Sequence, residues 1–230
     1  MPTLHLRGQT PESLAEAFPG LGLPLARKVV RRLVGEDADD LDHVRGLARA
    51  RAAQVLAGGS LDRLEVVDRR RSRVDPFVKY LLRTPDGQLV ETVRIPLEKP
   101  RWSVCVSSQV GCALGCRFCE TGRMGFTRNL EAWEMVEQVL TVRRESPERP
   151  LTGVVLQGQG EPVQPSDTDI RAADVLRQPS GPRLGTSRVT NSPVGPRPQI
   201  ARYTDEGHPY PLMLSLTSAF SEKRERLVPL

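Results

Sequence analysis

Three cysteines lie close together on one short stretch of the chain, in the order Cys112-Ala-Leu-Gly-Cys116-Arg-Phe-Cys119. Thiolates at this spacing can each bind one corner of a cubane iron–sulfur cluster. Such a set leaves the fourth iron without a protein ligand, so that a small molecule can bind there. The spacing therefore predicts a 4Fe–4S cluster held by Cys112, Cys116 and Cys119.

The C-x3-C-x2-C pattern, with an aromatic residue before the last cysteine, normally goes with S-adenosylmethionine (SAM) as the molecule on the open iron. A zinc-binding structural module is the alternative. Structural zinc usually takes four ligands, often as two separated pairs. The three histidines lie far along the chain from the cysteines, but Cys105 could supply a fourth ligand, so the zinc alternative stays open.

Composition indicates an ordinary globular protein of one or two domains. The 230 residues are 38% hydrophobic and 27% charged, and no apolar run approaches the roughly 18 residues of a membrane span. The N-terminus lacks the basic start and apolar stretch of a secretory signal, which predicts a cytoplasmic protein without a membrane partner. All four cysteines fall between positions 105 and 119, and this clustering favours a metal site over a disulfide framework. The net charge of +5 fits a nucleic-acid partner or ordinary surface charge.

Apolar periodicity predicts the elements that would position the cysteines. Helices are expected near 10–20, 25–33 and 41–56, and a hairpin of strands 78–83 and 88–95 around Pro85-Asp86-Gly87. The arginine run from Arg69 to Arg73 before the hairpin is interpreted as solvated surface, with RNA contact as the less favoured alternative.

Strands and helices alternate beyond residue 102. Expected strands cover 103–110, 153–157, 188–192 and 212–216, and expected helices cover 132–140 (capped near Asn129), 170–176 and 199–204. This alternation predicts an α/β fold with a parallel sheet or a partial (βα) barrel.

A longer motif surrounds the cysteines: Cys105-Val-Ser-Ser-Gln-Val-Gly-Cys112, then the cysteine segment, then Thr121-Gly122 and Gly125-Phe126-x-Arg128-Asn129-Leu130. It closely resembles the RlmN/Cfr family of radical SAM methyltransferases, which act on carbon 2 (in one branch carbon 8) of adenine in 23S rRNA and on tRNA. The resemblance implies a 4Fe–4S cluster, SAM, 23S rRNA and tRNA as partners, and a reducing partner such as flavodoxin or ferredoxin. It implies a helical, RNA-contacting accessory domain at 1–60, a β-hairpin extension at 61–100 and a partial radical SAM barrel at 101–230, incomplete at its C-terminus.

Particular residues match the family's functional positions. Gly160 and Glu161 match its SAM-binding Gly-x-Gly-Glu-Pro segment. Ser192 matches a SAM-contacting serine in a Val-Ser-Thr segment, and the run Ser215-Leu216-Thr217 matches a Ser-Leu-His ligand segment. Glu91 matches the proposed proton acceptor, and Cys105 matches the thiol that resolves a covalent RNA–enzyme intermediate. On spacing alone, the serines fit strand ends, Glu91 fits a solvated side chain, and Cys105 fits an inert buried cysteine.

The sequence also departs from the family. Thr217 replaces a histidine, Pro193 a threonine, and Gln157 and Gln159 replace methionines. The family continues beyond the segment that matches Arg226-Leu227-Val228-Pro229, and that continuation carries a SAM-binding asparagine and the cysteine that becomes methylated. We therefore expect a truncated or decayed member or a fragment, with an inactive Fe–S and RNA-binding relic as the alternative to an active enzyme.

Overall fold

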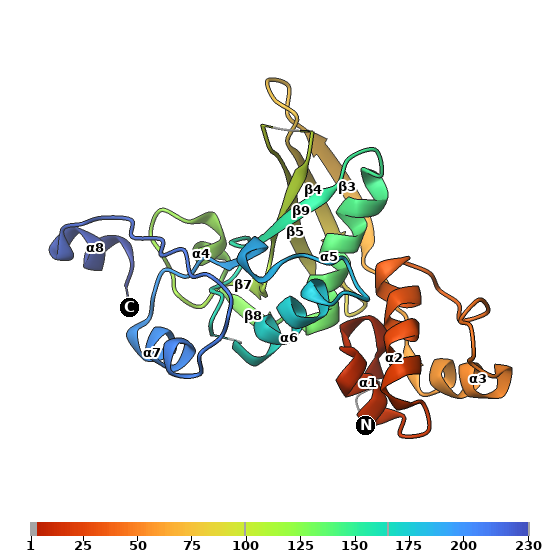
Figure 1. Ribbon diagram of the computed structural model, residues 1–230. Coiled ribbons are helices and arrows are strands. Elements are labelled where there is room, and N and C mark those ends of the chain that lie inside the picture. The colour runs from red at the N-terminus through yellow and green to blue at the C-terminus, as the bar shows by residue number, and fades with distance from the viewer. Residues whose placement is uncertain (1–3, 99, 165, 230) are drawn as a thin grey trace.

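A six-stranded mixed sheet forms the centre of the molecule (Figure 1). The computed structural model describes residues 4–98, 100–164 and 166–229. The strands lie in the order β10-β9-β6-β5-β4-β3. Their bounds are β3 Glu65–Arg71, β4 Val78–Arg83, β5 Leu89–Pro96, β6 Trp102–Val106, β9 Leu151–Leu156 and β10 Val189–Asn191.

Two strand arrangements meet within this sheet. Strands β6, β9 and β10 are parallel, whereas β3, β4 and β5 form an antiparallel meander that joins β6 through β5. The α/β class predicted from the sequence is confirmed, with half of the sheet parallel and half antiparallel. Parallel strands place their carboxyl ends at one edge, which is where ligands bind in open α/β sheets.

Helices and short elements surround the sheet. The helices are α1 Pro11–Ala17, α2 Gly22–Val30, α3 Arg49–Ala57, α4 Glu120–Met124, α5 Ala132–Glu145, α6 Ser166–Arg177, α7 Arg197–Asp205 and α8 Ser221–Leu227, and the single turns are η1 Leu6–Gly8, η2 Arg31–Gly35 and η3 Thr186–Arg188. Two small sheets pair β1 Leu4–His5 with β2 Gly59–Ser60, and β7 Gln109–Gly111 with β8 Phe126–Asn129. No helix in the described ranges combines the length and apolar character needed to cross a bilayer.

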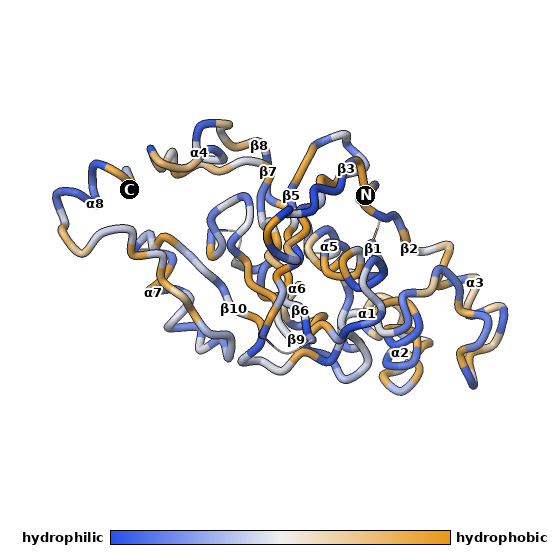
Figure 2. The backbone as a smooth tube through the Cα atoms, turned by 90° about the horizontal axis from the view of Figure 1, so that it is seen from above, coloured by the Kyte–Doolittle hydropathy of each residue, from blue (hydrophilic) through white to orange (hydrophobic). Residues whose placement is uncertain are grey.

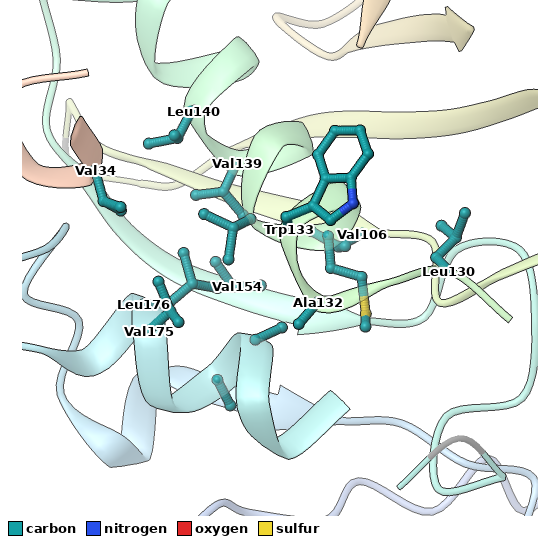
Figure 3. Packing of buried hydrophobic residues seen from close by; sticks show 14 of the residues in the cluster. Val34, Val106, Leu130, Ala132, Trp133, Val139, Leu140, Val154, Val175 and Leu176 are labelled. Carbon is teal, nitrogen blue, oxygen red and sulfur yellow. The ribbon is translucent and has the colours of Figure 1, made fainter. Parts of the chain in front are cut away.

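Helix α5 packs on one face of the sheet and forms the centre of the core. Its residues from Ala132 to Val142 are all buried, because sheet, α6 and the N-terminal elements surround it. Figure 3 shows side chains of α5, α6 and the strands in one cluster, with Val139 close to Val154 of β9. The hydropathy view shows apolar colour concentrated in these central elements (Figure 2). The opposite sheet face carries the partly exposed residues of β5, β6 and β9.

The N-terminal elements are attached to α5 by ring stacking and by an ion pair at the surface. The rings of His5 and Trp133 stack with centroids 3.8 Å apart, and burial lowers the pKa of His5 to about 4. Arg144 of α5 pairs with Asp37 at 2.7 Å. At the other end of the sheet, Arg94 lies 4.1 Å from the centroid of the Trp102 ring.

Four details of the sequence prediction were wrong. No strand forms at 212–216, where Leu212 makes one isolated bridge to Asn191. The edge strand β3 was not predicted, although it includes part of the arginine run. The helix expected over 41–56 begins only at Arg49. Helix α5 is capped by Glu131 and Glu134, not by Asn129, which belongs to β8.

Candidate active site at the carboxyl ends of the parallel strands

The predicted site residues follow the three parallel strands at the edge where these strands end. The cysteine loop comes after β6 and the short strand β7, Gly160 and Glu161 come after β9, and Ser192 comes directly after β10. Because the three strands run parallel in adjacent positions, these loops lie side by side. The topology therefore assembles residues that are more than 70 positions apart in the sequence.

The cysteine loop is held at its base by β7 and β8. The Cys112 N–H donates to the Gly125 carbonyl at 2.8 Å. Gly111 has φ +74°, and a Cβ there would lie 1.9 Å from the Gly125 oxygen, so only glycine fits. Cys112 and Cys116 are buried and Cys119 is partly exposed. The three thiols thus share one tightly closed loop.

The chemistry of the three thiols fits an iron–sulfur cluster. Burial raises the pKa of Cys112, and the nearby charges of Glu161 and Cys119 raise it further. The pKa of Cys116 is raised in the same way, first by burial and then by Cys112 and Cys119. Cluster binding would therefore release protons. Within the described ranges no three His, Cys, Asp or Glu side chains form a ready-made ligand set, so the fit rests on donor type and loop, not on a preformed geometry.

The turn after β9 approaches the cysteine segment closely. A Cβ on Gly160, whose φ is +103°, would lie 2.7 Å from the Gln109 side chain. The Gln109 Oε1 atom accepts a hydrogen bond from the Glu161 N–H at 2.9 Å, and the Ser108 N–H donates to the Gln159 carbonyl at 2.9 Å. The absence of a side chain at Gly160 thus lets the turn lie against β7.

Glu161 is buried beside the loop that follows β10. Its carboxylate accepts hydrogen bonds from the N–H groups of Val194, at 3.0 Å, and Gly195, at 3.3 Å. Burial raises the pKa of Glu161 to about 7, although these two N–H groups act in the opposite direction. The side chain is 1% exposed. Glu161 therefore joins the β9 turn to the β10 loop and lies near the thiols.

The structure brings Ser192 and Ser215 together but leaves the next two predicted residues exposed. The Oγ atoms of Ser192 and Ser215 are 3.3 Å apart. Leu216 is 50% exposed, and Thr217, at φ +64°, donates from its Oγ1 only to the Ser215 carbonyl, at 3.4 Å. The hydroxyl groups of Ser192 and Ser215 thus lie together, and the loop after β10, which begins at Ser192, also contacts Glu161. Leu216 and Thr217 are exposed to solvent.

Glu91 and Cys105 share the sheet face that α5 does not cover. Val93 pairs with Cys105 across β5 and β6, so Glu91, two residues earlier, has the same orientation and is a diagonal neighbour. Lys79 pairs with Glu91 at 2.8 Å. Burial raises the pKa of Cys105 to about 11. The two predicted catalytic residues therefore lie close to each other.

Gln109 and Arg128 support these loops, and neither role was predicted from the sequence. Gln109 contacts Glu161 through Oε1 and donates from Nε2 to Asn129 at 2.8 Å. Arg128 forms two hydrogen bonds to Glu134, at 2.7 and 2.8 Å, and two to Asp86, at 2.8 and 2.9 Å. Gln109 falls within the strand predicted at 103–110, and no sequence signal distinguished it there. Nothing in the sequence pattern pairs Arg128 with the hairpin turn.

A groove of about 700 Å³ lies between the cysteine loop and the C-terminal helices. Its lining comes from three segments: Ala113, Leu114, Gly195, Pro196, Arg197, Pro198, Ser221, Arg224, Glu225, Val228 and Pro229. The Arg117 N–H donates to the Leu227 carbonyl at 2.9 Å, which attaches α8 to the cysteine loop. The groove therefore opens beside the thiols.

Comparison with solved structures identifies the class of protein. A crystal structure of a radical SAM methyltransferase from Sphaerobacter thermophilus superposes with a TM-score of 0.86 at 37% identity, covering 99% of this chain and 67% of that one. The fold is thus that of a radical SAM methyltransferase. No family model matches the chain.

Curated relatives narrow this class. A probable RNA methyltransferase from Myxococcus xanthus is 45% identical over 85% of the chain, and one from Anaeromyxobacter is 44% identical over 99%. A dual-specificity RNA methyltransferase RlmN from Syntrophobacter fumaroxidans is 40% identical over 89%. The chain belongs to the family of RlmN-type radical SAM RNA methyltransferases, as the motif predicted. It spans 54%, 66% and 59% of the lengths of these three relatives.

Proposed function

We propose that this chain is the SAM-binding and RNA-binding part of an enzyme that methylates carbon 2 of adenine in 23S rRNA and tRNA. The observation that carries the proposal is the convergence of three segments at one sheet edge. The cysteine loop, the Glu161 turn and the Ser192–Ser215 pair come from separate strands and lie together. The relatives are named RNA methyltransferases, which supports RNA as the substrate.

The residues of the site divide the binding task. Cys112, Cys116 and Cys119 would hold a 4Fe–4S cluster, which when bound supplies the electron that breaks a carbon–sulfur bond of SAM. Glu161 would accept hydrogen bonds from the SAM ammonium group, and Gly160 would allow the ligand to approach the backbone. The Oγ atoms of Ser192 and Ser215 lie close enough together to contact one ligand group. In this scheme Leu216 and Thr217 would reach the ligand through their backbone.

Glu91 and Cys105 would serve the RNA adenine on the exposed sheet face. A thiol with a pKa near 11 is protonated at neutral pH, and the thiolate is the attacking form. Cys105 therefore needs a proton acceptor before its thiolate can attack the sulfur of the methyl-carrying cysteine, which lies in the family's continuation. The new disulfide bond would replace that sulfur's bond to carbon, and the methylated RNA would leave. Glu91 is the diagonal neighbour that carries a carboxylate, and Lys79 keeps that carboxylate in place. We assign proton removal to Glu91 and product release to Cys105.

The remaining parts of the proposal concern partners and organisation. We propose that 1–60 contacts RNA, that 61–100 is a hairpin extension, and that β6, β9 and β10 begin a radical SAM barrel within 101–230. The electron would come from flavodoxin or ferredoxin, in the cytoplasm. The arginines of β3 and Arg73 would contact RNA phosphates, since they lie on an edge strand and the turn beyond it.

Anaerobic reconstitution with iron and sulfide tests the proposal. The reconstituted chain should contain four irons, bind SAM, and cleave it to 5′-deoxyadenosine with a strong reductant. Glu161→Ala should weaken SAM binding about tenfold or more, whereas Glu222→Ala on exposed α8 should not change it. Zinc in place of iron would support the structural module. RNA binding with an iron cluster but without SAM cleavage would support the inactive relic.

Transfer to the base is measured separately. In an enzyme that includes the family's continuation with its methyl-carrying cysteine, methyl-labelled SAM, reductant and an unmodified 23S rRNA fragment should give label in carbon 2 of adenine, whereas the 230 residues alone should give none. Label at carbon 8 would contradict the carbon-2 assignment while leaving the radical SAM chemistry intact.

A further inference from the structure

A buried aspartate on α6 lies under the turn that presents Glu161. Asp169 is 1% exposed, and its Oδ2 accepts a hydrogen bond from the Val163 N–H at 2.9 Å. Its Oδ1 has no hydrogen-bond partner among the described residues. A buried carboxyl group with an unpaired oxygen is costly, so its presence requires an explanation.

The backbone of the turn is strained at the residue that Asp169 contacts. The Gln164 N–H donates to the Glu161 carbonyl at 3.3 Å, which closes a four-residue turn with Pro162 in second position. Val163, in third position, has φ +73°. This is the pattern of a type II turn, where glycine is the usual third residue. A β-branched residue at positive φ is an outlier, and such strain gathers at functional sites.

The strain at Val163 and its hydrogen bond to Asp169 together imply a specific role for Asp169. Without the Asp169 acceptor, the Val163 N–H would be buried without a partner, and Val163 would relax toward negative φ. That relaxation would rotate the turn and displace Glu161, two residues away. Burial raises the pKa of Asp169 to about 8, and the charge of Glu161 adds to this rise.

We propose that Asp169 is a positioning residue that holds Val163 in the left-handed conformation and thereby fixes Glu161 for binding the ammonium group of SAM. This inference rests on the proposed function of Glu161. Asp169 lies on α6, outside the family motif, so the motif alone assigns it no role in SAM binding.

A rescue experiment separates this role from a general contribution to stability. Glycine adopts positive φ without strain, so Val163→Gly removes the need for Asp169 to hold the turn in shape, although without Asp169 the N–H at position 163 stays unpaired. In the reconstituted protein, Asp169→Ala should weaken SAM binding about tenfold by equilibrium dialysis. The double variant Asp169→Ala/Val163→Gly should recover to within about threefold of the unmodified protein. Asp169→Asn keeps an acceptor oxygen and should also stay within about threefold, which covers the case in which Asp169→Ala does not fold.

Glu137→Ala is the matched control, because it removes another buried carboxylate, on α5, without touching the turn. It should lower stability and leave SAM affinity unchanged. Loss of affinity in Asp169→Ala without rescue by Val163→Gly, or no loss at all, would overturn the proposal.

Amide hydrogen exchange provides a readout that does not depend on SAM. Val194 and Gly195 donate their N–H groups to Glu161, so a displaced Glu161 exposes them. Exchange at both amides should accelerate about tenfold in Asp169→Ala and return in the double variant. If the unmodified chain fails to bind SAM, the proposed function is wrong, and this exchange result still decides whether Asp169 positions Glu161.

Discussion

Glu161→Gln should make the protein more stable at pH 8 while weakening SAM binding. The Glu161 carboxyl has its pKa raised from 4.5 to about 7, so the native state binds this proton more tightly than the unfolded state does. The stability that the protonated Glu161 contributes is fully present below pH 4.5 and is lost as the pH rises through about 7. At about 1.4 kcal/mol for each pKa unit, ionised Glu161 costs about 3 kcal/mol above pH 7.

The amide variant avoids that cost but loses part of the hydrogen bonding. Its single carbonyl oxygen can accept from Val194, and loss of the contact to Gly195 costs about 1 kcal/mol. Glu161→Gln should therefore gain about 2 kcal/mol at pH 8 and little or nothing at pH 5. Urea unfolding at both pH values measures the difference.

Glu145→Gln supplies a control of opposite sign. The hydrogen bond from Arg69 lowers the pKa of Glu145, so ionised Glu145 stabilises the native state at high pH. This variant should be less stable than the unmodified protein at pH 8. If Glu161→Gln also lost stability at pH 8, the argument that burial dominates at Glu161 would be refuted.

Three further predictions concern the metal, the RNA and the support of the loops. Replacing any of Cys112, Cys116 and Cys119 by alanine should abolish iron binding by metal analysis, whereas Cys105→Ala should retain it; equal loss in Cys105→Ala would contradict the three-ligand assignment. RNA affinity should fall with salt, and Arg71→Ala should reduce the steepness of log K against log salt concentration by about 0.9. Arg69→Ala should change this slope less, because Arg69 already pairs with Glu145. An unchanged slope in Arg71→Ala would exclude a contact between Arg71 and an RNA phosphate. Arg128→Ala should lower the free energy of unfolding by about 3–5 kcal/mol, measured with denaturant, because it removes the ion-pair partner of the buried Glu134. Asp86→Ala removes an exposed partner of Arg128 and should lower it by about 1 kcal/mol or less. Equal losses in the two variants would refute the importance of the buried pair.

The sequence predicted elements where apolar alternation and turn signals agreed. The strand at 78–83 has the predicted bounds, because its alternating residues face α5 and solvent in turn and Pro85-Asp86-Gly87 ends it. The edge strand β3 was missed because its residues are mostly charged, and pairing with β4 alone extends them. The apolar run at 212–216 lacks a strand partner, since β10 ends at Asn191 before Pro193.

Some residues of the candidate site could be predicted from the sequence, whereas others are evident only in the structure. The family motif singled out Glu161, and the structure places it near the cysteine loop because parallel strands bring their carboxyl ends together. Its predicted role in binding SAM stays a prediction. Thr217 was placed by resemblance alone, and it lies exposed. Gln109 could not be found, since it accepts from the N–H of Glu161, which is far away in the chain. Asp169 could not be found either, because only the folded turn presents the Val163 N–H to it.

The fluorescence of the two tryptophans can report on two separate places in this protein, the contact between the N-terminal elements and α5, and the start of β6. Trp133 stacks on His5 where the N-terminal elements meet α5, and Trp102 lies beneath Arg94 at the start of β6. Detachment of the N-terminal elements would separate the first pair of rings and alter only the Trp133 emission. Single Trp→Phe variants would therefore show whether the helical segment unfolds on its own or together with the sheet.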